Sequence, residues 1–319
     1  MTIPQPIWRF FQLVISTTIY IFAQISGFMK KTNFKVASVA VAALFLGSLS
    51  SCSNKGAEEG GEKKDTTLAD SKRIDSLSAQ KKQDIDFKFA TLEANIPSPF
   101  SLINDMKGHN VPFKKELLNP DGNLSKYTSA YKKEVNFGVY GVDLAYINFY
   151  GQNQDMMKYF NNIQKLSEDL NLDKVFEVYA SRFKSNSDNH DSVIAIVDNV
   201  FSATDGYLNK NDRYLVASHV IAGSIIETNY LSLSLLKDMK KGADNEKFFE
   251  KVFNENLAIY HLINLFEKYT DKDSKDLLAN MKTYKAAYES TIKSVNDLTP
   301  ENISKAVGLI GTLRDKVIK

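Results

Sequence analysis

The chain has 319 residues, of which 43% are hydrophobic, 24% charged and 11% aromatic, a composition that excludes wholesale disorder, collagen-like repeats and a multi-pass membrane protein. The single cysteine, Cys52, excludes a disulfide framework and a zinc site built on clustered thiolates. Four of the 40 basic residues and none of the 38 acidic residues lie in residues 1–51, so the rest of the chain carries a net charge of −2. Binding to nucleic acid is therefore not expected.

Residues 29–51 have the pattern of an export signal. A lysine-rich start is followed over residues 36–49 by an uncharged stretch of Ala, Val and Leu, whose length suits a signal peptide and is short for a bilayer span. The stretch ends on four residues that resemble a bacterial lipobox: Leu49, Ser50, Ser51 and Cys52. This resemblance implies lipidation of the Cys52 sulfur, cleavage before Cys52 and acylation of the new amino terminus. A buried cysteine at the end of a core helix is disfavoured, because polar sequence follows at once.

The segments on either side of this signal have different predicted roles. We interpret residues 1–28 as an extension upstream of the true start at Met29, since one export signal is enough. A transmembrane helix over residues 10–28 is the alternative, because this mainly apolar stretch, though interrupted by Gln and Thr, is 19 residues long and can span a bilayer. Residues 52–83 begin with the lipidated cysteine and continue as a linker rich in Gly, Glu and Lys. Such a stretch buries too little surface to offset its chain entropy, which predicts a flexible tether.

Residues 84–319 are predicted to form a single all-α domain. Residues 84–89 alternate between polar and apolar side chains, which indicates a short strand or extended arm. Residues 121–299 contain no proline, as long helices require. Apolar side chains there recur at intervals of three and four residues, and Thr299-Pro300 places a cap residue before a proline at the first helical position. We expect about nine to ten antiparallel helices packed as a bundle, at 98–107, 123–134, 135–150, 153–171, 173–185, 189–208, 211–240, 244–269, 273–296 and 300–318.

Ionisable residues interrupt two segments, 135–146 and 215–226, that are otherwise apolar or small and look like central helices. These residues are Asp143, His219 and, directly after the second segment, Glu227. Glycines in the first segment, Gly138 and Gly141, predict a close helix–helix approach. Buried charges are rarely left unpaired, so each ionisable residue should have a partner, with three tyrosines available as donors: Tyr140, Tyr146 and Tyr230.

Two interpretations of these three residues stay open. We favour a hydrogen-bonded core network that fixes helix register. The alternative is a pocket in which two carboxylates and an imidazole act as general acid and base, or bind a cation or small ligand. His219 and Glu227 lie about 80° apart around a helix, too far for a tight metal-ligand edge, so we predict no metal site. Glycine-rich phosphate loops, nucleophile elbows and dinucleotide fingerprints are absent from the sequence, and no cofactor is predicted.

The chain resembles the uncharacterised all-helical lipoproteins of Bacteroidota. The lipobox leader carries the resemblance, and residues 96–99, 137–144 and 222–227 add to it in the helical domain. The resemblance implies a protein of the cell envelope, anchored to the outer membrane by its lipidated terminus, with the domain in the periplasm or at the cell surface. It implies no activity and no catalytic residues.

These observations favour a non-enzymatic binding or scaffold module that is tethered to the membrane through Cys52 and has an envelope protein as partner. The alternative hypothesis is a protein that binds a small ligand or a metal through Asp143, His219 and Glu227. An enzyme ranks third.

Overall fold

The computed structural model describes residues 84–85, 102, 105, 108–109, 111–186, 189–211 and 213–319. Nine α-helices and three 3₁₀ helices are described in this part of the chain, which contains no strand. The prediction of an all-α domain is therefore confirmed there. No helix in this part is long and apolar enough to cross a membrane. The predicted upstream extension, export signal, lipobox and linker, residues 1–83, all lie outside the described residues.

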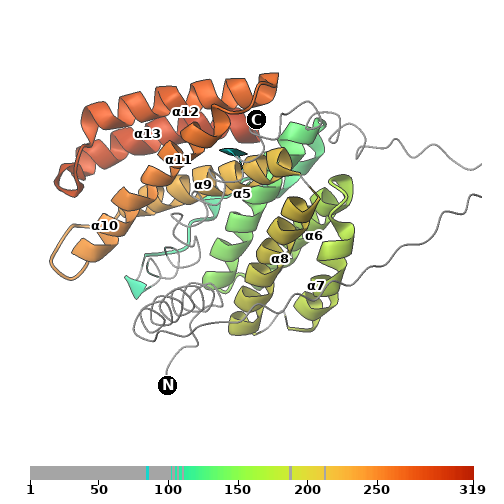
Figure 1. The fold of residues 1–319 in the computed structure, drawn as a ribbon. Coiled ribbons are helices and arrows are strands. Elements are labelled where there is room, and N and C mark those ends of the chain that lie inside the picture. The colour runs from blue at the N-terminus through green and yellow to red at the C-terminus, as the bar shows by residue number, and fades with distance from the viewer. Residues whose placement is uncertain are drawn as a thin grey trace, which may run out of the picture. The chain divides into compact units, whose positions relative to one another are not determined.

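The helices follow one another through short connections. Their order along the chain is η1 (Lys115–Leu117), η2 (Asp121–Lys126), α5 (Ala130–Phe149), α6 (Asn153–Asp169), α7 (Asp173–Ser185), α8 (His190–Lys210), α9 (Tyr214–Leu236), α10 (Glu246–Glu255), α11 (Leu257–Phe266), α12 (Lys272–Thr291), η3 (Val295–Asp297) and α13 (Pro300–Ile318). Helices that are consecutive in sequence pack together, such as α5 with α6 and α12 with α13 (Figure 1).

Several predicted boundaries are corrected by local hydrogen bonds. The helix expected at 123–134 does not form, because the Ser129 hydroxyl caps a single long helix, α5, by accepting from the Lys132 N–H. The helix expected at 244–269 is two helices, which meet at Asn256. The short strand expected at 84–89 is also wrong for its described residues, since Asp84 and Ile85 are helical. Helix α13 begins as expected, with Thr299 accepting from the Asn302 N–H.

Helices α5 and α9 form the centre of the domain. Nearly every residue of both is buried, and they pack more extensively against each other than any other pair (Figure 1). Two glycines allow this contact. A Cβ atom added to Gly138 would lie 2.0 Å from the Val220 carbonyl oxygen, and one added to Gly223 would lie 1.9 Å from the Val135 carbonyl oxygen. The expectation that Gly138 marks a close helix–helix approach is confirmed.

Replacing either crossing glycine with alanine is expected to force the two backbones apart. We expect Gly138→Ala and Gly223→Ala each to lower the free energy of unfolding by more than about 3 kcal/mol, because backbone atoms cannot yield as a flexible side chain can. Denaturant unfolding followed by circular dichroism measures the loss. The matched control is Gly308→Ala, where a new Cβ has no neighbour within 4 Å and removal of a helical glycine should stabilise by about 0.5–1 kcal/mol. Similar unfolding midpoints for the three variants would contradict the close crossing.

Candidate functional site

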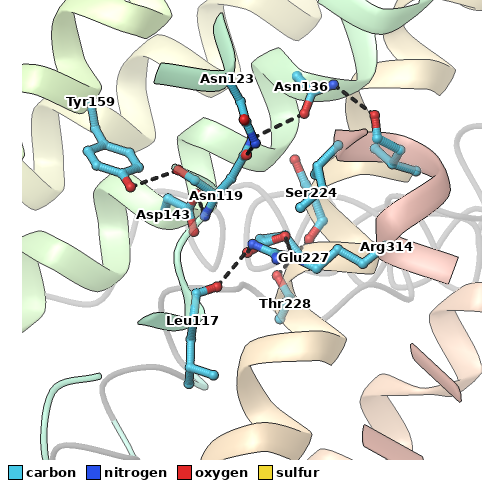
Figure 2. A network of polar contacts seen from close by, with 12 residues as sticks. Leu117, Asn119, Asn123, Asn136, Asp143, Tyr159, Ser224, Glu227, Thr228 and Arg314 are labelled. Atoms are coloured by element: carbon cyan, nitrogen blue, oxygen red, sulfur yellow. Dashed lines mark hydrogen bonds and ion pairs between the residues drawn. The ribbon is translucent and has the colours of Figure 1, made fainter. Parts of the chain in front are cut away.

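A buried ionic cluster joins α5, α9 and α13 (Figure 2). Glu227 on α9 and Arg314 on α13 form a bidentate salt bridge, in which Arg314 Nε lies 2.5 Å from Glu227 Oε2 and Arg314 Nη2 lies 2.6 Å from Glu227 Oε1. The Arg314 guanidinium also donates to the Leu117 carbonyl at 3.0 Å and stacks 4.2 Å from the ring centroid of Tyr230. Because the Arg314 guanidinium donates to both Glu227 oxygens, neither oxygen of this carboxylate lacks a hydrogen-bond partner.

Asp143 on α5 is fully buried next to this pair. Its Oδ2 accepts from the Asn119 backbone N–H at 3.1 Å, whereas Oδ1 has no hydrogen-bond partner. Burial raises the pKa of Asp143 well above its ordinary value, and the negative charge of Glu227 raises it further against the opposing effect of Arg314. Burial and the charge of Glu227 therefore both favour the neutral form of Asp143, and Glu227 and Arg314 balance each other's charge.

The loop that carries Asn119 closes the cluster from one side (Figure 2). Asn119 is fully buried between η1 and η2. Its carbonyl accepts from the Tyr159 hydroxyl at 2.7 Å, and its side-chain amide donates to the Tyr127 hydroxyl and to Asn136 Oδ1. The Asn136 amide in turn donates to the Val317 carbonyl at 3.1 Å. The network therefore ties this loop to α5, α6 and α13 and leaves few groups for a ligand.

His219 belongs to a second, separate cluster. Its Nδ1 lies 2.5 Å from Glu134 Oε2 on α5, and its Nε2 lies 3.0 Å from Ser274 Oγ on α12. The Tyr131 ring packs edge-on against the imidazole at a centroid distance of 5.0 Å. We call Glu134, His219 and Ser274 the imidazole chain. It links the same two central helices, α5 and α9, to the first turn of α12.

The imidazole chain has the order of groups found in a Ser-His-acid triad, in which an acid orients the base of a nucleophilic hydroxyl. Two features oppose catalysis. Ser274 and His219 are both 0% exposed, so a substrate cannot reach the hydroxyl. The surroundings are also negatively charged. Asp273 and Asp276 lie close enough to Tyr131, which packs against His219, to raise the pKa of its hydroxyl beyond the larger effect of burial. Negative charge beside Ser274 would destabilise the oxyanion of an acyl-transfer reaction.

The structure thus brings together Asp143 and Glu227 but not His219. The donors differ from those expected: the Tyr140 hydroxyl donates to the Pro120 carbonyl, and the Tyr146 hydroxyl accepts from the Lys114 N–H. Four partners were missed by sequence reasoning: Arg314, Asn119, Glu134 and Ser274. The sequence contains a pattern that could have predicted the burial of Arg314, because this residue lies between Ile310 and Val317 on the apolar face of α13. Among the described residues, no group of three His, Cys, Asp or Glu side chains is placed to hold a metal ion.

A further buried carboxyl group lies at the end of α10. Glu255 is 1% exposed, and neither of its oxygens has a hydrogen-bond partner. Burial alone raises its pKa to about 8. At neutral pH, Glu255 is therefore largely protonated in the folded state, and ionisation opposes folding.

Comparisons with protein-family models, with curated proteins and with solved structures give no match to this chain. The function must therefore be argued from its own residues.

Removing charge from the ionic cluster should have unequal effects. Glu227→Gln leaves the buried Arg314 guanidinium without its counter-charge and is expected to cost about 3–5 kcal/mol of unfolding free energy. Asp143→Asn replaces a neutral acid with a neutral amide of similar shape and should cost less than about 1 kcal/mol. Denaturant unfolding at pH 7 measures both. Equal losses would show that Asp143 is ionised in the folded protein.

Glu255 should make stability depend on pH. Its folded pKa, about 8, is above the ordinary value of 4.5, so the contribution of Glu255 to stability is greatest below pH 4.5, falls as the pH rises and levels off above pH 8. Glu255→Gln should remove this fall, making the variant more stable than the parent protein by roughly 3 kcal/mol at pH 7 and equal to it near pH 4. The exposed Glu250→Gln on the same helix is the control, and unfolding midpoints across the pH range measure the difference. A constant difference at all pH values would contradict the raised pKa.

Proposed function

We propose that this protein is a cell-envelope lipoprotein, in which a non-enzymatic helical binding or scaffold module is tethered to the outer membrane through Cys52. One observation carries the proposal: the lipobox-like Leu49-Ser50-Ser51-Cys52 follows a lysine-led apolar stretch and precedes a polar linker. The thiol of Cys52 is the nucleophile that would take a diacylglyceryl group, and its freed amino group would be acylated. Each buried methylene of these chains contributes about 0.8 kcal/mol, so several chains anchor firmly.

The architecture of the helical domain is consistent with a module that binds or holds a partner. Its buried ionisable groups are used in ties between helices: Glu227 with Arg314, and Glu134 with His219. Such ties hold the helices in a defined arrangement without offering a reactive group to solvent. The linker would let this module reach a partner in the envelope, either in the periplasm or at the cell surface.

The anchor is tested by metabolic labelling with an alkyne-tagged fatty acid in a bacterial host. The parent chain should incorporate the label and sediment with membranes, and Cys52→Ala should lose the lipid label because the acceptor thiol is gone. Ser53→Ala, one residue beyond the motif, should behave as the parent. If Cys52→Ala is still labelled and membrane-bound, the anchor proposal fails.

The non-enzymatic part of the proposal has its own readout. A fluorophosphonate probe modifies serine hydroxyls that a neighbouring base activates, and the folded protein should show no labelling at Ser274 because this hydroxyl is buried. Labelling of Ser274 that is abolished by His219→Gln would overturn this part and establish the imidazole chain as a nucleophilic site.

A further inference from the structure

A cavity of about 310 Å³ lies where the junction of α10 and α11 faces the C-terminal end of α12. Helices α11 and α12 pack side by side here (Figure 1). The walls are mainly aromatic and aliphatic, from Phe253, Leu257, Tyr260 and Ile292. Leu257 is 41% exposed, one of two large apolar side chains that stand out to solvent among the described residues. A cavity of this size and lining suits a small ligand with an apolar body.

The polar group in the wall is incompletely paired. Tyr288 lines the cavity and is 2% exposed, yet its hydroxyl makes no hydrogen bond of normal geometry; the nearby Asn256 side chain only lowers its pKa against the larger, opposite effect of burial. The neighbouring Asn256 amide, which also lines the cavity, is engaged with the Tyr284 hydroxyl at 3.0 Å. Buried hydroxyls are normally paired, so the Tyr288 hydroxyl has hydrogen-bonding capacity for a group that enters the cavity.

Two charged side chains line the cavity, Glu289 and Lys293, and only Glu289 is in a salt bridge with a described residue. Glu289 lies 3.8 Å from Lys285 Nζ. It also forms a hydrogen bond with Tyr260. Burial is the main cause that raises the pKa of the Tyr260 hydroxyl, and Glu289 raises it further. Lys293 is exposed, and its ammonium group forms no salt bridge with a described residue, although its charge acts on the Asp297 carboxylate, which also accepts from its backbone N–H. The carboxylate at the cavity is thus already paired with Lys285, whereas the Lys293 ammonium group is in no salt bridge with a described residue. This difference favours an anionic ligand over a cationic one.

We propose that this cavity binds a small amphipathic carboxylate. Its aromatic or branched apolar body lies against Leu257 and Tyr260, its carboxylate pairs with Lys293, and the Tyr288 hydroxyl donates to a ligand oxygen. The inference rests on the proposal that the helical domain is a binding module, but not on the anchor, because no lining residue belongs to the lipobox or the linker.

The test uses the full chain in a mild detergent, which does not require the anchor, and two matched probes, phenylacetate and 2-phenylethylamine, observed by saturation-transfer NMR. Phenylacetate should bind with a Kd on the order of 1 mM or tighter, as expected for a ligand of about ten non-hydrogen atoms. The amine, similar in its apolar body but opposite in charge, should bind at least about fivefold more weakly. Failure of phenylacetate to bind at concentrations about tenfold higher, or equal binding of the two probes, would overturn the proposal.

Variants locate the site. Tyr288→Phe removes only the hydroxyl and should weaken phenylacetate about fivefold, the effect of one hydrogen bond. Lys293→Ala should weaken phenylacetate by a similar factor and should not weaken the amine, since it removes a like charge, whereas Lys316→Ala on α13 should change neither. Leu257→Trp, at an exposed position, should fill the cavity and abolish binding without unfolding the domain. Parent-like binding by both Tyr288→Phe and Leu257→Trp would overturn the location. Cys52→Ala should bind as the parent, so loss of the anchor and failure of this site are distinguishable.

Discussion

The domain depends on the close crossing of α5 and α9. At Gly138 and Gly223 the two helices meet backbone against backbone, at distances that leave no room for a methyl group. The paired contacts Glu134–His219 and Asp143–Glu227 follow the same order on both helices, so α5 and α9 run in the same direction. This direction is the one expected if consecutive helices are antiparallel, because three helices, α6, α7 and α8, lie between α5 and α9 in the chain.

The crossing also explains why two polar clusters exist and why they are separate. Glu134 precedes Gly138 by one helical turn and Asp143 follows it by more than one, while His219 and Glu227 flank Gly223 by one turn each. The apolar contact at the glycines therefore has an ionisable pair at either side. Outer helices complete these pairs, with Arg314 from α13 for one and Ser274 from α12 for the other. The clusters hold the outer helices in register on the central pair.

Buried polar groups without partners occur in several parts of the described domain, including α9 and the break between α10 and α11. The groups of the ionic cluster and the imidazole chain are satisfied by protein atoms, apart from one oxygen of the neutral Asp143. Near the break between α10 and α11, by contrast, the Glu255 carboxyl and the Tyr288 hydroxyl are buried without partners. A polar group without a partner costs stability, and at this end of the domain one such group, the Tyr288 hydroxyl, lines the cavity. The ionic cluster, which held two of the expected site residues, serves structure.

The sequence by itself determined the helical class, the central position of α5 and α9 and the burial of Asp143, His219 and Glu227, because hydrophobic periodicity and charges within apolar segments are local patterns. It also carries the whole argument for a lipid anchor at Cys52, since a lipobox is a motif of adjacent residues. Only the tertiary structure decided the partners. Arg314 and Glu227 are 87 residues apart, and Glu134 and His219 are 85 apart. Pairing over such separations follows from helix packing, which no local pattern encodes, and the same packing separates His219 from Glu227 and forms the cavity beside Tyr288.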